Sequence, residues 1–255
     1  MKRTVFLAAL LATTAGAYAQ SPINWPQDIN WQIDTGFDYS SGKYGGTEAT
    51  DVLSVPVDLR LQMDRFRLEA TMSYLDVKGP GVVAGGVVVG GTGPVTTRSG
   101  LGDLNVGAAF LLNKDGDAPA IELEGIVKVP TAGSGLGTGQ YDYLAQVNLY
   151  HSFTPRFMLF GSAGYQWLTS FPTVALESGL IATGGANFKT SDDTSIGFTA
   201  SYHQQYYAGL GDVYALSPYV LWNVVPNWRV TAYGTFGLSK ASPDYGAGLR
   251  LIFYR

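Results

Sequence analysis

The sequence predicts an all-β protein, a transmembrane antiparallel up-and-down β-barrel of about twelve strands. Three observations predict it: apolar and polar residues alternate along most of the chain, the alternating segments are long enough to cross a bilayer, and aromatic residues gather near both ends of those segments. Composition agrees, because 14% of the 255 residues are charged and 46% are hydrophobic. The absence of cysteine excludes a disulfide scaffold.

The first residues have the composition of a secretory signal peptide. Lys2 and Arg3 precede the apolar stretch from Val5 to Leu11, and Ala17-Tyr18-Ala19 fits the small-x-small pattern of a cleavage site. We therefore expect export followed by cleavage near Ala19. After that point no apolar run reaches the roughly 20 residues that a membrane-spanning helix needs.

We expect three parts in the chain: a signal peptide at residues 1–19, a periplasmic N-terminal segment at 20–29, and an outer-membrane barrel at 30–255. Residues 20–29 lack strand periodicity, and a small plug in the lumen is the alternative for them. The net charge is −4, and nucleic-acid binding depends on neutralising phosphates, so we expect no nucleic-acid partner. We expect a location in the outer membrane of a Gram-negative bacterium. The expected partners there are membrane lipid, lipopolysaccharide and, during biogenesis, the barrel assembly machinery.

Strand periodicity is clearest where Leu53, Val55 and Val57 are apolar and the residues between them are smaller or polar. Successive strand side chains point to opposite faces, so such a segment has one apolar and one polar face. Each segment is about 10–13 residues long, which suits a tilted transmembrane strand. The twelve predicted strands are 30–40, 51–63, 65–77, 102–113, 120–129, 142–153, 157–168, 179–189, 194–205, 213–223, 228–239 and 245–254.

The connections between these segments alternate in length, as in outer-membrane barrels. Short turns rich in Gly, Pro, Asn and Asp follow every second strand, beginning with Asp64 alone. Longer loops, such as 41–50 and 130–141, lie at the opposite end. Both termini fall on the short-turn side, which requires an even number of strands.

The position of aromatic residues distinguishes a membrane barrel from a soluble β-sandwich or soluble barrel. Trp222 and Trp228 flank a short turn on the apolar face, whereas tyrosines such as Tyr74 and Tyr202 lie at the loop end of that face. Two aromatic belts around an aliphatic band are expected at the two lipid–water interfaces. The apolar face should therefore point outward to lipid, with the polar face lining the lumen.

Several charged residues share the polar face in the half nearer the short turns. Enclosed charges are costly unless they are paired, so we expect an ionic girdle that links opposite walls and narrows the pore. The alternative is that these ion pairs only brace the barrel. The predicted pore-lining charged girdle consists of Arg60, Arg65, Arg67, Glu69, Glu122, Glu124, Arg229 and Arg250.

The loop-side half of the predicted lumen is lined by uncharged polar and aromatic groups. A mixed lining of this kind suits a small, weakly polar solute. The predicted lumen polar lining includes Asn105, Gln146, Tyr150, Gln166, Ser201, His203 and Tyr219.

Loop 78–101 contains an apolar, glycine-rich and uncharged stretch from Val82 to Gly91. An apolar segment of this size seldom stays fully exposed to solvent. It could fold inward as a constriction, rest on the outer leaflet, or extend the two flanking strands as a hairpin, and the sequence leaves these three open.

The sequence offers little support for an enzyme. Ser201 and His203 share a face, but that face is the lumen, and no acidic residue on the same strand orients the imidazole ring. The stretch Asn113–Asp117 is too short for a calcium loop and lacks the later glutamate. We therefore expect no catalytic residues, no metal and no cofactor.

One set of motifs is similar to a known family. Ser99-Gly100-Leu101-Gly102-Asp103-Leu104, then Lys128-Val129-Pro130-Thr131, a glycine-rich loop and Asp142-Tyr143 resemble the "MetA-pathway of phenol degradation" family of Gram-negative outer-membrane transporters. The likeness is best from Ser99 to the C-terminus. It implies passive uptake of hydrophobic or aromatic compounds.

We therefore expect a monomeric barrel acting as a passive channel for small solutes, including hydrophobic or aromatic ones. The alternatives are a structural or adhesive barrel with a closed lumen, a lipid-modifying barrel enzyme, and a soluble secreted β-protein.

Overall fold

The computed structural model describes residues 6–7, 23–24, 30–84, 87–89, 93–113, 119–133, 135–170 and 175–255. The expected signal peptide and N-terminal segment lie outside these residues, apart from strands β1 (Phe6–Leu7) and β2 (Ile23–Asn24), which pair with each other. No helix among the described residues is long and apolar enough to cross a membrane.

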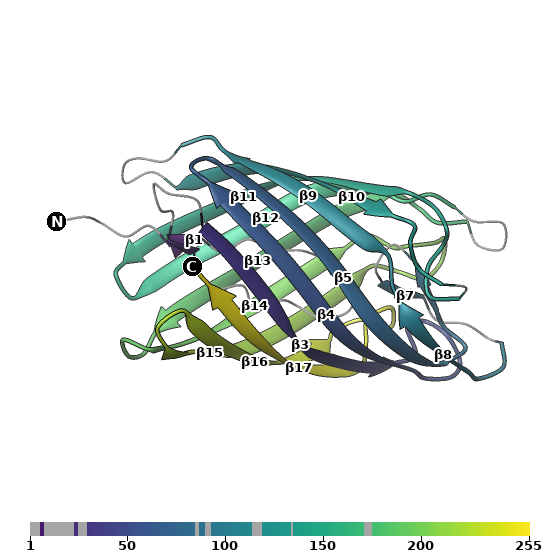
Figure 1. The fold of residues 1–255 in the computed structure, drawn as a ribbon. Helices are drawn as coiled ribbons and strands as arrows, with labels where there is room; N and C mark the ends of the chain where they lie inside the picture. Colours follow the sequence, from purple (N-terminus) through teal and green to yellow (C-terminus); the bar gives the residue numbers. More distant parts are fainter. Residues whose placement is uncertain are drawn as a thin grey trace.

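In the described part of the chain, twelve long strands close into an antiparallel barrel, because the last strand, β17, pairs with the first, β3 (Figure 1). This confirms the predicted fold. The strands are β3 (Asn30–Gly42), β4 (Thr50–Met63), β5 (Phe66–Gly79), β9 (Leu104–Leu111), β10 (Ala120–Val129), β11 (Asp142–Thr154), β12 (Phe157–Trp167), β13 (Gly179–Lys189), β14 (Thr194–His203), β15 (Val213–Val225), β16 (Trp228–Gly237) and β17 (Tyr245–Tyr254).

One position in the wall is shared by two strands. β9 pairs with residues 66–71 of β5, and β8 (Thr96–Leu101) pairs with residues 74–79 of the same strand. Gly102 and Asp103 separate the two pieces. The predicted strand 102–113 is therefore shorter than expected, and the wall continues beyond the break as β8. Among the described strands, β8 pairs only with β5, whereas β9 also pairs with β10.

Burial alternates along the strands in the sense that a membrane barrel requires. Leu59 is 49% exposed on the outer face, whereas Arg67 and Glu122 are 1% and 0% exposed inside. A soluble β-protein would bury the aliphatic side chains and expose the charges. The opposite arrangement is stable only where the outer surface meets hydrocarbon.

Exposed and half-buried aromatic side chains form pairs near both ends of the barrel, as the two expected belts require. They bracket the band of exposed aliphatic residues between them. The short-turn end has Trp31–Phe253 and Trp228–Phe253, with ring centroids 5.2 and 4.8 Å apart, and the loop end has Tyr39–Tyr245 and Tyr202–Tyr214, at 6.2 and 5.2 Å.

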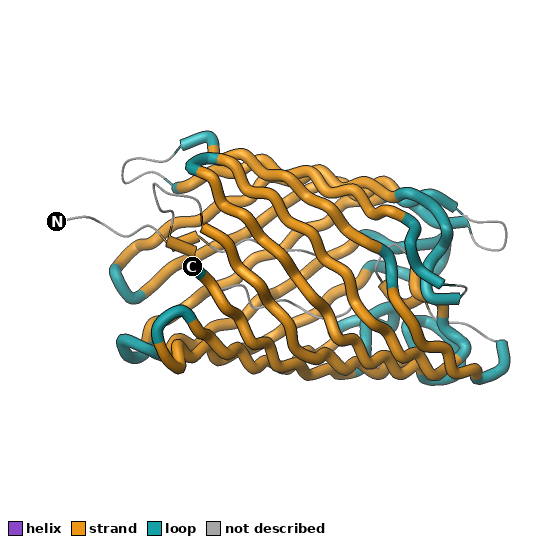
Figure 2. Tube along the Cα trace, in the orientation of Figure 1, coloured by secondary structure: helices purple, strands orange, loops and turns teal. Residues whose placement is uncertain are grey.

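The longer connections gather at one end of the barrel and tighter turns lie at the other (Figure 2). Asp64 and Asn227 adopt the left-handed conformation in two of the tight turns, with φ of 49° and 69°. Asp and Asn tolerate this conformation better than most residues. The first turn contains Arg65 as well as Asp64, so it is one residue longer than the sequence predicted.

Candidate functional site

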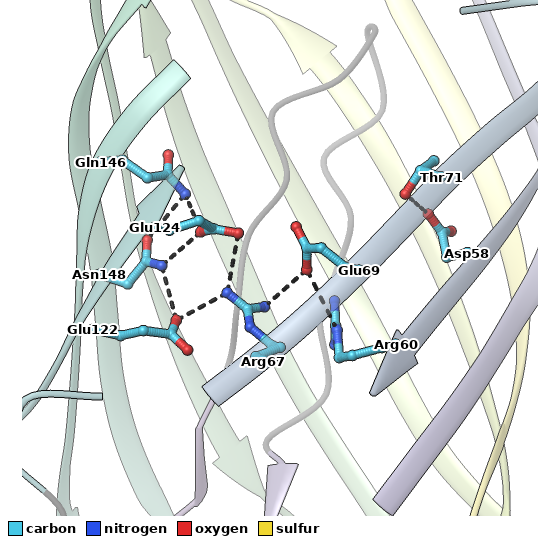
Figure 3. Close-up of polar contacts among 9 residues, drawn as sticks. All are labelled: Asp58, Arg60, Arg67, Glu69, Thr71, Glu122, Glu124, Gln146 and Asn148. Carbon is cyan, nitrogen blue, oxygen red and sulfur yellow. Dashed lines mark hydrogen bonds and ion pairs between the residues drawn. The ribbon is translucent and has the colours of Figure 1, made fainter. Parts of the chain in front are cut away.

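The centre of the ionic network is Arg67, which points into the barrel from β5. One guanidinium nitrogen, Nη2, lies 2.9 Å from Glu122 Oε2 and 3.0 Å from Glu124 Oε1, and Nη1 lies 3.2 Å from Glu69 Oε2. Arg60 Nε approaches the same Glu69 oxygen at 3.7 Å. Figure 3 shows Arg67 between the two glutamates of β10 and Glu69 of its own strand. One cation therefore holds three carboxylates.

Two amide side chains of β11 complete this network. Asn148 Nδ2 donates to Glu122 Oε2 at 3.0 Å and to Glu124 Oε2 at 2.7 Å, and Gln146 Nε2 donates to Glu124 Oε2 at 2.7 Å (Figure 3). Buried carboxylates need such partners to offset the loss of water. Gln146, expected in the loop-side lining, is thus part of the girdle.

The girdle does not link opposite walls, which corrects our expectation. Arg67 on β5 reaches Glu122 and Glu124 on β10 across a single intervening strand, β9. β9 has Gly107 beneath the Glu69 side chain, where a Cβ would lie 2.8 Å from Glu69 Cγ. A small residue on β9 therefore lets the charged side chains lie along the wall.

Arg250 on β17 is at the centre of a second ionic cluster, whose acidic members the sequence analysis missed. Its guanidinium lies 2.8 Å from Asp38 Oδ2, 3.0 Å from Asp58 Oδ2 and 3.6 Å from Asp34 Oδ1. Asp58 also accepts a hydrogen bond from Thr71 (Figure 3). The alternation could have identified Asp34 and Asp38 as inward-facing, because they follow the outward-facing Ile33 and Phe37.

The other two predicted girdle residues lie apart from both clusters. Arg65 lies in the turn before β5, where Nη1 donates to the Leu112 carbonyl at 3.0 Å. Arg229 donates to Asn223 Oδ1 at 2.8 Å and lies 5.1 Å from the centroid of the Tyr254 ring. Both lie near the short-turn end. They were grouped with the girdle in the sequence analysis only because their place in the strand alternation points inward.

The ionic clusters occupy one continuous part of the inner wall. We name the inner surface of β17, β3, β4, β5, β9, β10 and β11 the ionic arc, and that of β12 to β16 the neutral arc. Inward residues of the neutral arc are mostly uncharged; Lys189 and Arg229, near the short-turn end, are the exceptions among the described strands. The predicted residues Gln166, Ser201, His203 and Tyr219 all belong to this arc.

Two tyrosines that face the lumen lie over glycines of neighbouring strands. A Cβ on Gly197 would lie 2.4 Å from the Tyr219 ring, and one on Gly248 would lie 2.3 Å from the Tyr233 ring. Tyr219 donates to Asn187 Oδ1 at 3.1 Å, and Tyr233 donates to Asp38. The glycines thus let each ring lie against the wall, and Tyr233 connects the neutral arc to the Arg250 cluster.

One predicted lining residue, Tyr150, lies elsewhere than the sequence suggested, whereas Gln166, His203 and Asn105 face inward as expected. Tyr150 was expected in the loop-side half, but it is buried toward the short-turn end, in a cluster with Leu111 and Phe160. Gln166 and His203 form a pair in which Oε1 and Nε2 are 2.7 Å apart. Asn105 is partly buried on the inner side of β9.

Apolar residues also face the lumen, and the sequence analysis missed them. Ile126 on β10, Leu144 on β11 and Ile181 on β13 are buried in one cluster on the loop side of the girdle. Each is in phase with polar inward residues, as Ile126 is with Glu124. The parity rule could therefore have found them, but a search for polar residues on the polar face passed over them.

The apolar loop 78–101 packs over the loop-side mouth. β6 (Val82–Ala84) and β7 (Val87–Val89) pair as a small hairpin, while β5 and β8 extend the flanking strands. Val83 and Val88 are buried with the inward-facing Leu75 and Val77 and with other mouth residues. The described parts of the loop thus combine two of the expected forms, because β5 and β8 extend the flanking strands and Val83 and Val88 pack inward against Leu75 and Val77.

Tyr44, in the loop after β3, belongs to the same mouth cluster. Its hydroxyl donates to Ser40 Oγ at 2.9 Å, and burial raises the pKa of this phenol well above its usual value. Tyr44 therefore stays neutral and keeps its hydrogen bond throughout the pH range in which proteins are normally studied.

The geometry gives no support to a serine–histidine pair. His203 Nε2 contacts Gln166 Oε1, and Nδ1 contacts the Gln204 carbonyl oxygen. Both ring nitrogens are therefore engaged by groups other than Ser201. A nucleophile needs a base within hydrogen-bonding reach, and here the base has other partners.

The fold is shared with solved structures of an outer-membrane channel, a porin and an autotransporter translocator domain. The COG4313 outer membrane channel from Pseudomonas putida F1 is 13% identical, with a TM-score of 0.67 over 90% of this chain and 96% of that chain. The NanC porin is 11% identical, with a TM-score of 0.56 over 88% and 99%. The translocator domain of the autotransporter NalP from Neisseria meningitidis is 11% identical, with a TM-score of 0.51 over 90% and 88%.

A search of curated proteins finds no match. At the level of families the result is clear, because residues 34–255 match the family described as "Putative MetA-pathway of phenol degradation". The match covers the whole barrel beyond the first residues of β3, including the motifs at Gly100–Asp103, Lys128–Thr131 and Asp142-Tyr143. The chain belongs to this family.

Proposed function

We propose that the protein is a passive channel of the Gram-negative outer membrane that takes up small neutral solutes, with hydrophobic or aromatic compounds as its class of cargo. The observation that carries this proposal is the lining of the lumen. Girdle charges are paired and buried along one arc, while Ile126, Leu144 and Ile181 pack as a buried apolar cluster on the inner side of the wall, on the loop side of the girdle. A pore for ions or sugars has no need of an apolar inner surface.

A row of hydroxyl side chains offers a passage beside the girdle. Ser162, Thr183 and Ser201 are register neighbours on β12, β13 and β14, and all three are partly exposed, whereas Asn148 in the same row is buried. Among the described residues, Ser162, Thr183 and Ser201 form an uncharged row along which a neutral solute can move. The solved structures of similar fold include channels and a porin, and the family description refers to phenol degradation, which supports an aromatic cargo.

Uptake in cells tests this function. A Gram-negative host without hydrophobic-solute channels of its own, expressing the protein, should accumulate a radiolabelled neutral monoaromatic compound faster than the same host with an empty vector. A charged aromatic acid of similar size should gain little. Equal uptake with and without the protein would contradict the proposal.

The second candidate is a structural barrel with a closed lumen, which is favoured by the complete burial of Arg67 and Glu122. Planar-bilayer recordings separate the two. Discrete openings from purified, folded barrel support a channel, and a silent bilayer with folded protein supports the scaffold.

We also propose lipopolysaccharide around the loop-side belt, the barrel assembly machinery as a partner during biogenesis, and cleavage of the signal peptide near Ala19. The Gly248-x-x-Leu251-x-Phe253 pattern near the C-terminus supports assembly by that machinery, because it resembles the signal of outer-membrane barrels. Mass spectrometry of the protein purified from outer membranes would test the cleavage site by its N-terminal peptide.

A further inference from the structure

Three motifs that the sequence analysis singled out meet at one point of the barrel rim. Asp103 precedes β9, Lys128 lies near the end of β10, and Asp142 begins β11. Lys128 Nζ lies 2.7 Å from Asp142 Oδ2, 3.2 Å from Asp103 Oδ2 and 2.9 Å from Thr138 Oγ1. We name Asp103, Lys128 and Asp142 the clasp.

The clasp is a buried site with a single cation. Lys128 is 4% exposed and Asp142 is 2% exposed. An ammonium group has three hydrogens, and here it finds three oxygen partners. Removing that cation would leave two buried carboxylates facing each other, which is strongly unfavourable. Asp103 and Asp142 can therefore stay this close together only while Lys128 is charged and lies between them.

Each aspartate of the clasp also holds a piece of loop. Asp103 Oδ1 accepts the Ala132 backbone N–H at 3.0 Å, and Asp142 Oδ1 accepts the Thr169 N–H at 2.8 Å. Thr131 adds to this, because its Oγ1 accepts the Leu104 N–H at 2.9 Å. We name residues 131–133 and 135–141 the strap. The clasp holds this strap at two points, through Asp103 at Ala132 and through Lys128 at Thr138.

The strap lies beside β8, on the side where no described strand pairs with it. The Gly133 N–H donates to the Leu101 carbonyl at 3.3 Å. From there Leu136 enters the apolar mouth cluster with Val83 and Val88 of the β6–β7 hairpin, and Ala132 packs against the same cluster. Ala132 thus contacts the clasp through its backbone and the mouth cluster through its side chain.

We propose that Lys128, Asp103 and Asp142 are positioning residues of the channel, which hold the strap so that Leu136 keeps the β6–β7 hairpin packed over the loop-side mouth. They control how often the mouth opens, and they touch no solute. This inference rests on the proposed channel function, but it concerns gating rather than the identity of the cargo.

Substitution Lys128→Met tests the proposal, because it keeps the length of the side chain and removes the charge. We expect the ratio of closed to open dwell time in single-channel recordings to fall at least about tenfold, since the strap loses its anchor. Lys128→Arg should restore most of the closed time. Lys240→Met is the matched control, because Lys240 is exposed in the connection between β16 and β17 and has no part in the clasp.

Gating of Lys128→Met identical to that of the unmodified protein, with the barrel folded as judged by heat-modifiable gel migration, would overturn the proposal. If Lys128→Met does not fold, Asp103→Asn provides a milder variant, because Lys128 then keeps Asp142. Unchanged gating in that folded variant would overturn the proposal equally.

A disulfide provides an independent test, because the chain has no cysteine of its own. The pair Val83→Cys and Leu136→Cys, oxidised, should hold the mouth closed, and a reductant should reopen it. Conductance unaffected by a disulfide that mass spectrometry confirms would overturn the proposal. Failure of aromatic uptake with these gating effects intact would contradict the proposed cargo and leave the gating role standing.

Discussion

The two arcs of the inner wall accommodate their polar side chains in different ways. On the ionic arc, Arg67 and Arg250 each hold three carboxylates, and the contacts run along the wall, within one strand, to the adjacent strand or across a single intervening strand. On the neutral arc, hydroxyls and amides line the wall, and Tyr219 lies over a glycine of the next strand. The comparison teaches that ion pairs stabilise one wall of this lumen, while the proposed passage lies along the other wall.

The largest expected effect is the loss of Arg67. Arg67→Met should reduce the free energy of unfolding by about 3–5 kcal/mol, because three buried carboxylates lose their shared cation. Urea titration of the barrel in lipid vesicles, followed by tryptophan fluorescence, measures this. Adding Glu122→Gln should recover part of the loss. Arg229→Met is the control, and an equal loss there would remove the distinction between the arcs.

On the neutral arc, the effect should come from steric conflict. Gly197→Ala places a Cβ 2.4 Å from both the Tyr219 ring and the Ala186 carbonyl oxygen, so we expect a loss of about 1–3 kcal/mol and a lower conductance as the ring moves into the lumen. Gly184→Ala on β13 is the matched control, because nothing lies within 4 Å of its Cβ position. Similar behaviour of the two variants would show that the ring does not depend on Gly197.

Charge selectivity should be weak, because most inward-facing charges are paired. Reversal potentials under a potassium chloride gradient should lie close to zero, and Glu122→Gln should move them only slightly toward anion preference. A strong preference for either sign in the unmodified protein would mean that the ionic arc lines the permeation path.

The smallest expected effect is on lipid hydrolysis. Preparations of the unmodified protein and of Ser201→Ala should show the same background rate with phospholipid substrates, because His203 is engaged by Gln166. Hydrolysis that disappears in Ser201→Ala would establish an enzyme and reverse our reading of the neutral arc.

The fold was predictable because period-two patterning carries most of the information in a barrel. The bounds of β10 and β13 agree with the sequence analysis at both ends, even though β13 is rich in glycine. The break between β8 and β9 was not predictable, because Gly102 and Asp103 continue the alternation and only the tertiary contacts of Asp103 show where the strand stops.

Only part of the girdle's membership was predictable, and its geometry was not. Parity places Arg67, Glu122 and Glu124 inside, yet it does not say which strand separates them or how far a guanidinium reaches. Arg229 shows the limit of the rule, because an inward position near a turn does not place a residue in the network. That the clasp is separate from the girdle could be seen only in the tertiary structure, because Lys128 and Glu124 lie on the same face of β10.

Accessibility of single cysteines in the cysteine-free chain tests the central claim most directly. With a small thiol reagent added during bilayer recording, Thr183→Cys on the neutral arc should react and block the conductance, and Asn148→Cys on the ionic arc should remain unmodified. Rapid block through position 148 together with no reaction at 183 would contradict the account, because the passage would then lie along the charged wall.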